Sequence, residues 1–235
     1  MSSEKSFHNK NQDSLVIDAY HRLEEMIVTC ELKPNMIVTE KELSEHLNIG
    51  RTPVREALKK LEMTHAILFL PRKGILIRVV SVDELLQQLN VRSVLEDLAV
   101  KYATLYATPA ERQQLFELAK EYRILTKEWH PAIEALRVDN KFNHLLCQCT
   151  RNPFISDTLL PLHTLARRNY YLNYFIDKNL TEKVNLLHAD LMDAIADSNM
   201  EEAISCNNRL LEAVQQFSSL SLKVWIPDIG TSSQV

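Results

Sequence analysis

Two arginines four residues apart are the side chains in this sequence best suited to reading a nucleic acid. Arg51 and Arg55 lie within the run Ile49-Gly-Arg-Thr-Pro-Val-Arg-Glu-Ala-Leu58. On a helix this spacing puts both guanidinium groups on one face, while Val54 and Leu58 face the core. The planar guanidinium matches O6 and N7 of guanine, and one such contact discriminates between bases by about 1–3 kcal/mol. An Arg-x-x-x-Arg pair alone is more often a solvated helix face, so the surrounding elements must decide.

The elements around this pair have the order of a winged helix-turn-helix. Apolar residues at helical spacing over Asp13–Cys30 predict a first helix, and Thr39 with Glu42 forms a capping box that opens a second. Pro53 lies in the first turn of the next helix, where proline is tolerated. Two β-branched or aromatic runs on either side of Pro71–Gly74 predict a hairpin. This hairpin is the expected wing.

Basic residues concentrate in this segment although the whole chain has a net charge of −4. Residues 49–79 hold seven Lys or Arg against two Asp or Glu, whereas residues 81–235 hold 15 against 20. Phosphate attraction depends on the local field, so the block favours DNA as a partner. Thr52 would donate to a phosphate or a base, Lys41 would face the backbone, and the hairpin tip would enter the minor groove. The predicted DNA-binding residues are Lys41, Arg51, Thr52, Arg55, Arg72, Lys73 and Gly74.

Composition excludes several other classes of protein. Only three glycines occur, too few for a dinucleotide-binding fingerprint or a P-loop. No window approaches 18 uninterrupted apolar residues, and the N-terminus lacks an apolar signal region, so we expect no membrane partner. The four cysteines do not have the spacing of a disulfide framework or a zinc finger. These features predict a cytoplasmic protein with reduced thiols.

After Ser81 the apolar pattern is helical throughout. We expect helices at 109–128, 131–150, 154–176, 181–198 and 200–222. The predicted fold class is therefore mainly α, with an N-terminal winged helix-turn-helix and a C-terminal all-α helical bundle. The predicted organisation is a disordered tail (1–12), a DNA-binding domain (13–80), a helical effector-binding and dimerisation domain (81–225) and a flexible tail (226–235).

The first of these domains resembles the DNA-binding domain of the GntR family. The resemblance covers residues 15–79 and is carried by Arg51-Thr-Pro-Val-Arg-Glu-Ala-Leu58, Leu61 and the Pro71-Arg-Lys-Gly74 loop. Three positions depart from the family pattern. Gly50 replaces a serine, which removes a hydroxyl that could touch a phosphate, and Asn35 and His65 replace glycines. We expect Asn35 and His65 to adopt turn conformations, which Asn and His tolerate better than most residues.

The helical part resembles the FCD effector domain of the FadR-like branch of that family. The matching motifs are Arg92-Ser-Val-Leu-Glu96, Asp139-Asn-Lys-Phe-Asn143, Arg151-Asn-Pro153 and the helix with His188. The resemblance implies a divalent metal (Zn, Ni or Mn) held by four ligands. Asp139 and His188 match two of them, while Asn143 and Leu210 stand at the other two positions. The sequence therefore predicts no certain cofactor.

In place of a metal we expect Asp139, Asn143 and His188 to hydrogen-bond an effector directly. Arg92 would clamp a carboxylate of that effector with two hydrogen bonds. An ion pair between Arg92 and a neighbouring acid is an equally good interpretation. Asp139 as a buried polar anchor and His188 as a core histidine also remain open.

The resemblance implies a transcription regulator, most simply a repressor, that is not an enzyme. It would bind pseudo-palindromic operator DNA as a homodimer and respond to a small organic acid. Two alternatives remain. One is a DNA-binding regulator that has lost ligand sensing, and the other is a metal-dependent enzyme built on Asp139 and His188.

Overall fold

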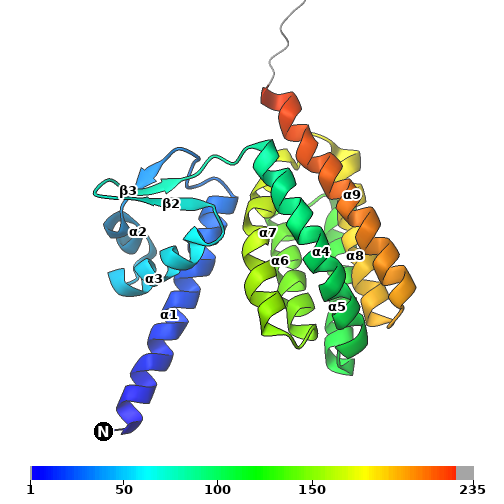
Figure 1. Ribbon diagram of the computed structural model, residues 1–235, viewed down its shortest axis with the longest axis horizontal. Helices are drawn as coiled ribbons and strands as arrows, with labels where there is room; N and C mark the ends of the chain where they lie inside the picture. Colours follow the sequence, from blue (N-terminus) through cyan, green and yellow to red (C-terminus); the bar gives the residue numbers. More distant parts are fainter. Residues whose placement is uncertain (1, 226–235) are drawn as a thin grey trace, which may run out of the picture. The chain divides into compact units, whose positions relative to one another are not determined.

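The structure, a computed structural model, describes residues 2–225, with side chains from 13 to 219 (Figure 1). The chain divides into two compact units. The first comprises the residues up to Val80 together with Pro161–Arg168, and the second comprises Ser81–Leu160 and the residues from Asn169 onward. Among the described residues, no helix combines the length and the apolar character that crossing a bilayer requires.

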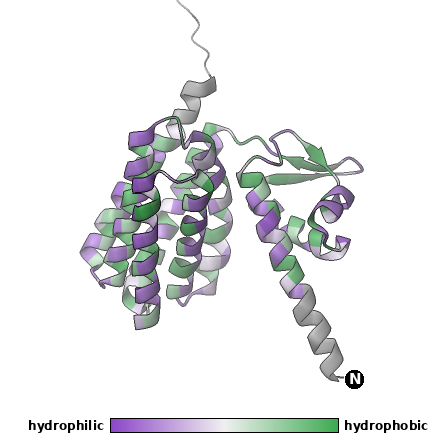
Figure 2. Cartoon of the chain, turned by 180° about the vertical axis from the view of Figure 1, so that it is seen from behind, coloured by the Kyte–Doolittle hydropathy of each residue, from purple (hydrophilic) through white to green (hydrophobic). Residues whose placement is uncertain are grey.

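The first unit is a winged helix-turn-helix, as the sequence predicts. Its elements are α1 (Ser2–Val28), β1 (Ile37–Val38), α2 (Glu40–Leu47), α3 (Arg51–Glu62), β2 (Ile67–Leu70) and β3 (Gly74–Ile77). The strands form an antiparallel sheet in the order β1-β3-β2, in which Phe69 pairs with Ile75 and Val38 pairs with Ile75 from the other side. β2 and β3 are largely hydrophobic in Figure 2. The wing is thus a hairpin fixed by a third short strand.

Local signals set the boundaries of α2 and the turns around it. The Thr39 hydroxyl accepts a hydrogen bond from the Glu42 backbone N–H (3.2 Å), and the Glu42 carboxylate accepts one from the Thr39 N–H (2.8 Å). Asn48 ends the helix in the left-handed conformation, with φ of 54°. Asn35 and His65 also have positive φ, 66° and 60°, which confirms the turn conformations predicted for them.

The core of the first unit lies where α1 packs against α3. Leu23 and Ile27 of α1 are fully buried, as are Leu58 and Leu61 of α3. Burial of one such side chain contributes roughly 1.5–3 kcal/mol. These contacts hold the back of α3 and leave its opposite face free to present side chains.

A buried glutamate connects α1 to Pro161–Arg168, the part of α7 (Pro153–Asn173) that belongs to this unit. Glu24 is 5% exposed; its carboxylate accepts a hydrogen bond from the Thr164 hydroxyl (2.6 Å) and pairs with Arg167 (3.1 Å). Buried charges are tolerated when they are paired in this way. The unit therefore includes a stretch of chain far beyond its N-terminal 80 residues.

Helix α1 begins earlier than the apolar pattern of its sequence predicts. The backbone of residues 2–12, where a disordered tail is predicted, continues α1 from Ser2. This segment contains neither proline nor glycine, so nothing in it ends the helix that starts at its C-terminal side. The flexible tail predicted for 226–235 lies outside the described residues.

The second unit is an all-helical bundle. Its helices are α4 (Val82–Tyr106), α5 (Pro109–Glu128), α6 (Ala132–Cys149), α7 (Pro153–Asn173, in part), α8 (Lys178–Ala196) and α9 (Met200–Trp225). α8 packs against both α5 and α9, and α9 packs against α4. Ser81 and Thr108 form the capping boxes that open α4 and α5. The all-α prediction is confirmed.

One arginine ties the ends of two of these helices together. The Arg112 guanidinium donates to the carbonyls of Thr104 and Ala107, where α4 ends, at 2.9 and 3.0 Å. It also donates to the carbonyls of Ile195 and Ala196, where α8 ends, at 2.7 and 3.2 Å. The last carbonyls of a helix have no partner within it, and a cation also favours that end of the helix dipole. Arg112 therefore fixes the register of α4, α5 and α8.

Candidate nucleic-acid interface and effector site

Helix α3 presents its first turn outward. Gly50 is the N-cap residue and supplies no side-chain hydrogen bond, so the free N–H groups of the first turn remain available. Arg51 and Thr52 follow and are both exposed, whereas Pro53 and Val54 are buried. A helix N-terminus with free N–H groups and a cation is suited to contact phosphates and base edges. The structure thus gives Arg51 and Thr52 the positions that the sequence predicts.

Arg55 lies on the same outward face but already has a partner. Its Nε donates to both carboxylate oxygens of Glu40 at 2.9 Å, and its Nη2 lies 2.7 Å from Glu40 Oε2. Glu40 is the first residue of α2, and sequence reasoning missed it. The only signal for it was an acid in the first turn of the preceding helix. Arg55 can therefore be oriented by Glu40 or released from it.

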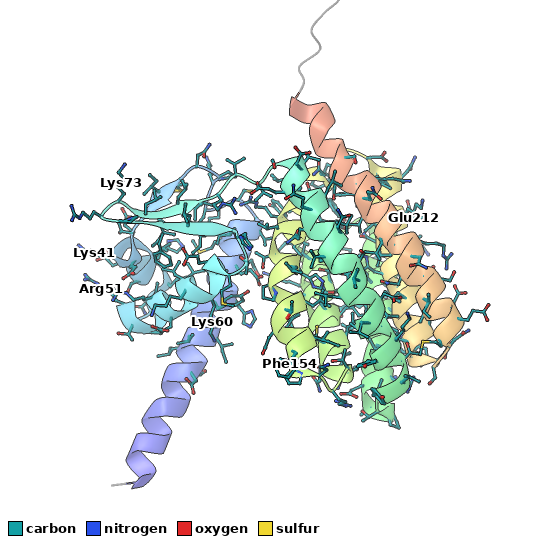
Figure 3. The ribbon with its side chains drawn as sticks, in the orientation of Figure 1. Lys41, Arg51, Lys60, Lys73, Phe154 and Glu212 are labelled. Carbon is teal, nitrogen blue, oxygen red and sulfur yellow. The ribbon has the colours of Figure 1, made fainter. Side chains whose placement is uncertain are left out.

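The other predicted basic contacts surround this turn. Lys41 is exposed and its Nζ lies 3.8 Å from Glu45, a weak ion pair. Arg72 and Lys73 are exposed at the tip of the β2–β3 hairpin, where Arg72 has a φ of 63°. Figure 3 shows Lys41, Arg51 and Lys73 on the same side of the first unit. Together they form one cationic surface, which we call the recognition face (Lys41, Arg51, Thr52, Arg55, Arg72 and Lys73).

Gly74 has a structural reason to be glycine. Its φ is 115°, and a Cβ there would lie 2.5 Å from the Val38 carbonyl oxygen. The residue begins β3 beside β1 rather than standing at the hairpin tip. Close approach between two strands of the unit therefore accounts for it, and close approach to DNA is not needed. Gly74 is therefore not part of the recognition face, and the DNA contact expected of it stays a prediction.

Three of the residues expected to bind an effector, Asp139, Asn143 and His188, are brought together in the second unit. Asp139 Oδ1 lies 3.3 Å from His188 Nε2, and Asp139 Oδ2 accepts a hydrogen bond from Asn143 Nδ2 at 3.1 Å. His188 Nδ1 donates to the Val184 carbonyl at 2.9 Å. The Nδ1 contact orients the ring so that Nε2 faces the Asp139 carboxylate. We call these three residues the polar cluster.

The polar cluster continues into a set of buried tyrosine and amide groups. Tyr122 stacks edge-on against His188, with ring centroids 5.6 Å apart. The hydroxyls of Tyr122 and Tyr170 are hydrogen-bonded to each other, and burial raises the pKa of both. Tyr170 in turn donates to Asn185 Oδ1 at 2.5 Å. Asn185 is 1% exposed, and its Nδ2 has no hydrogen-bond partner among the described residues, which leaves an unmet donor one helical turn from His188.

Arg92 has the ion pair that the sequence left as an equal alternative to a carboxylate clamp. Its Nε and Nη2 lie 3.0 and 2.7 Å from Glu96 Oε1, one turn further along α4. Both residues are less than a tenth exposed. The carboxylate on Arg92 is therefore one that the chain itself supplies. An effector would reach this guanidinium only by replacing Glu96.

The residues present do not fit a four-ligand metal site. Asn143 turns its amide nitrogen toward Asp139, and Leu210 is buried and has no donor atom. His144 is exposed and faces away from Asp139. Within the described residues, no group of three His, Cys, Asp or Glu side chains is placed to hold an ion. Asp139 and His188 alone remain as donors.

Comparison with known proteins agrees with both units. The model of the gntR family of bacterial regulatory proteins matches residues 15–77, and that of the FCD domain matches residues 87–213. The chain is 27% identical to the transcriptional repressor RspR of Escherichia coli K12 over 176 residues, which cover 75% of this chain and 76% of RspR. It is 26% identical to the transcriptional regulator YdhC of Bacillus subtilis, over 78% of this chain and 82% of YdhC.

A solved structure shares the fold. E. coli McbR/YncC aligns with a TM-score of 0.73 and 22% sequence identity, over 90% of this chain and 99% of that one. The two family models together cover the recognition face and the polar cluster. The chain therefore belongs to the GntR family of bacterial regulatory proteins, in the group whose DNA-binding domain is followed by an FCD domain.

Proposed function

We propose that the protein is a cytoplasmic transcriptional repressor that binds operator DNA as a homodimer and responds to a small organic acid. The observation that carries the DNA-binding part is the exposure of Arg51 and Thr52 at the free N-terminus of α3, beside Lys41 and Lys73. A two-fold dimer would place two copies of α3 in successive major grooves, with half-sites about 10 base pairs apart. RspR is named as a repressor, which supports repression rather than activation.

The effector part of the proposal centres on α4 and the polar cluster. An organic acid would take the place of Glu96 on Arg92, because a carboxylate matches the guanidinium in the same way. In the same unit, the Asn185 amide is a buried donor without a partner among the described residues. Release of Glu96 would alter the packing of α4, the helix that begins directly after the first unit. A ligand shifts the DNA-binding equilibrium only by its different affinity for the two arrangements.

A specific observation also favours a regulator that has lost ligand sensing. Arg92 and Asp139 already have partners within the chain, so neither of these two charged groups needs a ligand. Thermal-shift measurements of the full chain against a panel of small organic acids separate the two proposals. A stabilising acid whose effect disappears in Arg92→Met supports sensing. If no acid stabilises the protein, the sensing proposal fails and the second candidate stands.

Operator selection tests the main proposal. The purified full chain is mixed with a library of random duplexes at moderate salt, and bound fragments are sequenced. We expect enrichment of an inverted repeat with half-sites about one helical turn apart. A reporter whose promoter overlaps that repeat should lose expression when the protein is present. Recovery of no motif, or of a motif without two-fold symmetry, would contradict the proposal.

An enzyme built on the polar cluster has less support. The family consists of regulatory proteins, and Asp139 with His188 supplies neither a nucleophile nor a complete ligand set. The cysteines nearest in sequence, Cys147 and Cys149, are buried, and burial raises the pKa of each thiol to about 12. A thiol in that state is a poor nucleophile at neutral pH. The proposal therefore assigns no catalytic role to these residues.

A further inference from the structure

Helix α4 is apolar on the face that points away from its own unit. Its inner face buries Leu85, Leu89 and Ala99. Its outer face exposes Val94 (71%) and Leu105 (61%), with further apolar residues between and beside them. Single exposed apolar side chains are ordinary, but a continuous stripe along several turns marks a surface that another protein covers. We call Val91, Val94, Leu98, Tyr102 and Leu105 the α4 stripe.

The spacing of the α4 stripe is symmetric about Leu98. Val94 lies four residues before Leu98 and Tyr102 four residues after it. Val91 lies seven residues before and Leu105 seven after. If two copies of α4 run antiparallel with their Leu98 side chains opposed, Val94 therefore faces the partner's Tyr102 and Val91 faces the partner's Leu105. Such self-complementarity is what a two-fold interface requires.

Charges beside the stripe match the same arrangement. Asp97 and Lys101 lie on one flank of the stripe and form an ion pair of 2.6 Å within the helix. A two-fold axis perpendicular to α4 brings this flank against the same flank of the partner. In the Leu98 register, Asp97 and the partner's Lys101 differ by two residues along the helix axis, about 3 Å. Each copy therefore offers an acid to the other's base, twice per dimer.

We propose that the α4 stripe is the dimer interface, with two copies of α4 packed antiparallel around a two-fold axis at Leu98. This inference rests on the homodimer of the proposed function and adds the surface and the register. The occupant is a second copy of this chain, because an unrelated partner would require neither the symmetric spacing nor the paired Asp97 and Lys101. The inner face of the same helix holds Arg92 and Glu96, so effector exchange at that pair would be felt directly at the interface.

Cysteine crosslinking tests the register. In a Cys30→Ser background, which removes the half-exposed native thiol, Leu98→Cys should form a disulfide-linked dimer on mild oxidation. Val94→Cys alone should not, whereas Val94→Cys mixed with Tyr102→Cys should. A disulfide requires Cα atoms within about 7 Å, so these pairs discriminate between registers. Crosslinking through Val94→Cys alone, or none through Leu98→Cys, would overturn the register.

Charge exchange tests the flank. Asp97→Lys makes the flank entirely basic and Lys101→Asp makes it entirely acidic, so each variant alone should dimerise more weakly than the native chain. Mixed together, they should form heterodimers in excess of the statistical half of all dimers, measured by native mass spectrometry. A statistical mixture contradicts the proposed ion pairs.

Leu98→Arg tests the surface itself and has a matched control. It should raise the dimer Kd by about 100-fold or more, because two arginines would oppose each other without partners. Leu186→Arg on α8 is the control, since Leu186 is as exposed as Leu98, 38% each; it should leave the dimer intact. If Leu98→Arg stays dimeric and binds operator DNA, the α4 proposal fails while the proposed function stands. If the native chain is monomeric on its operator, the homodimer itself is wrong.

Discussion

The recognition face and the polar cluster treat charge in opposite ways. On the recognition face Arg51, Arg72 and Lys73 extend into solvent from a helix end and a hairpin tip. In the polar cluster and beside it, Asp139 and Arg92 are almost fully enclosed, and each already has a partner from its own chain. The first region presents cations to a partner outside the chain, whereas the second has its charges neutralised from within.

This difference determines what mutation of each region should do. An exposed cation contributes little to folding, and its removal should appear in binding. A buried charge pair contributes little net stability as a pair, but removal of one partner leaves the other uncompensated. The same arginine-to-neutral substitution should therefore affect DNA binding in one region and folding in the other.

The largest expected effect is on DNA binding by Arg51→Ala. Each bidentate contact to guanine is worth about 1–3 kcal/mol, so a dimer on two half-sites should lose about 2–6 kcal/mol of binding free energy. The free energy of unfolding should stay within about 0.5 kcal/mol of the native value, because Arg51 is exposed. Fluorescence anisotropy with the selected operator and urea denaturation provide the two measurements.

A matched substitution separates this effect from loss of general charge. Lys120→Ala removes an exposed cation from the second unit and should leave operator affinity unchanged. If the two variants lose equal operator affinity, the assignment of Arg51 as a base contact is wrong. The assignment is also wrong if Arg51→Ala retains full selectivity between operator and random DNA.

The next effect should be on folding, in Arg92→Met. Glu96 would remain buried without its ion pair, and loss of one member of such a pair costs about 3 kcal/mol or more. The double variant Arg92→Met, Glu96→Leu should recover most of that loss, because both charges are then gone. Urea denaturation of both variants checks this. If Arg92→Met is as stable as the double variant, Glu96 is not left buried and uncompensated, and the ion pair is accessible to water.

A smaller effect should appear when the pH is lowered. Although burial raises it, hydrogen bonds from Arg151 and Thr108 lower the pKa of Glu111 from 4.5 to about 2. A carboxyl pKa that is lower in the folded state stabilises the protein above about pH 4.5, and that contribution is lost as the pH falls toward 2. Arg151 is about two-fifths exposed, so solvent weakens the pair.

Arg151→Leu isolates this contribution. The variant should be less stable than the native chain at pH 7, and the gap between the two should narrow between pH 4.5 and pH 3. Denaturant midpoints of the native chain and the variant, measured at pH 4.5 and at pH 3, give the two stability differences to compare. A gap that stays constant would mean that Glu111 does not titrate abnormally in the folded protein.

The smallest effect should come from Glu40→Gln, which releases Arg55 on the recognition face. An exposed ion pair of this kind is worth about 1 kcal/mol or less, so folding should barely change. DNA affinity at low salt should rise modestly, by about tenfold or less, because one negative charge leaves the surface facing the phosphates. Anisotropy titrations at two salt concentrations measure this; weaker binding would mean that Glu40 orients Arg55 for its contact.

Features that depend on neighbouring residues were predictable from the sequence. The capping boxes at Thr39, Ser81 and Thr108 lie where their motifs stand, because each is closed within four residues. The outward direction of Arg51 followed from the apolar period of α3, which the core against α1 enforces. The positive φ of Asn35 and His65 followed from their places in turns.

Features that depend on residues far apart in the sequence were not predictable. Glu40 reaches Arg55 across the turn between two helices, and Glu24 meets Thr164 and Arg167 from about 140 residues away. The apolar periodicity of one helix does not predict which side chains of other helices it will contact. Sequence alone also cannot decide whether the Arg92 guanidinium pairs with Glu96 or with the carboxylate of an organic acid, since both partners offer the same group. The close approach of Gly74 to Val38 in β1 could not be predicted either, because the two residues are far apart in the sequence.

Whether the Arg51 guanidinium contacts a guanine base edge can be measured with a thermodynamic cycle that changes the protein and the DNA in turn. Native protein and Arg51→Ala are each titrated with the selected operator and with operators in which single guanines are replaced by 7-deazaguanine, which lacks the N7 acceptor. We expect one position per half-site where the replacement weakens native binding but has no effect on Arg51→Ala, with a coupling of about 1–3 kcal/mol. If the two losses add at every guanine, Arg51 does not contact a base edge, and the proposed mode of DNA recognition is wrong.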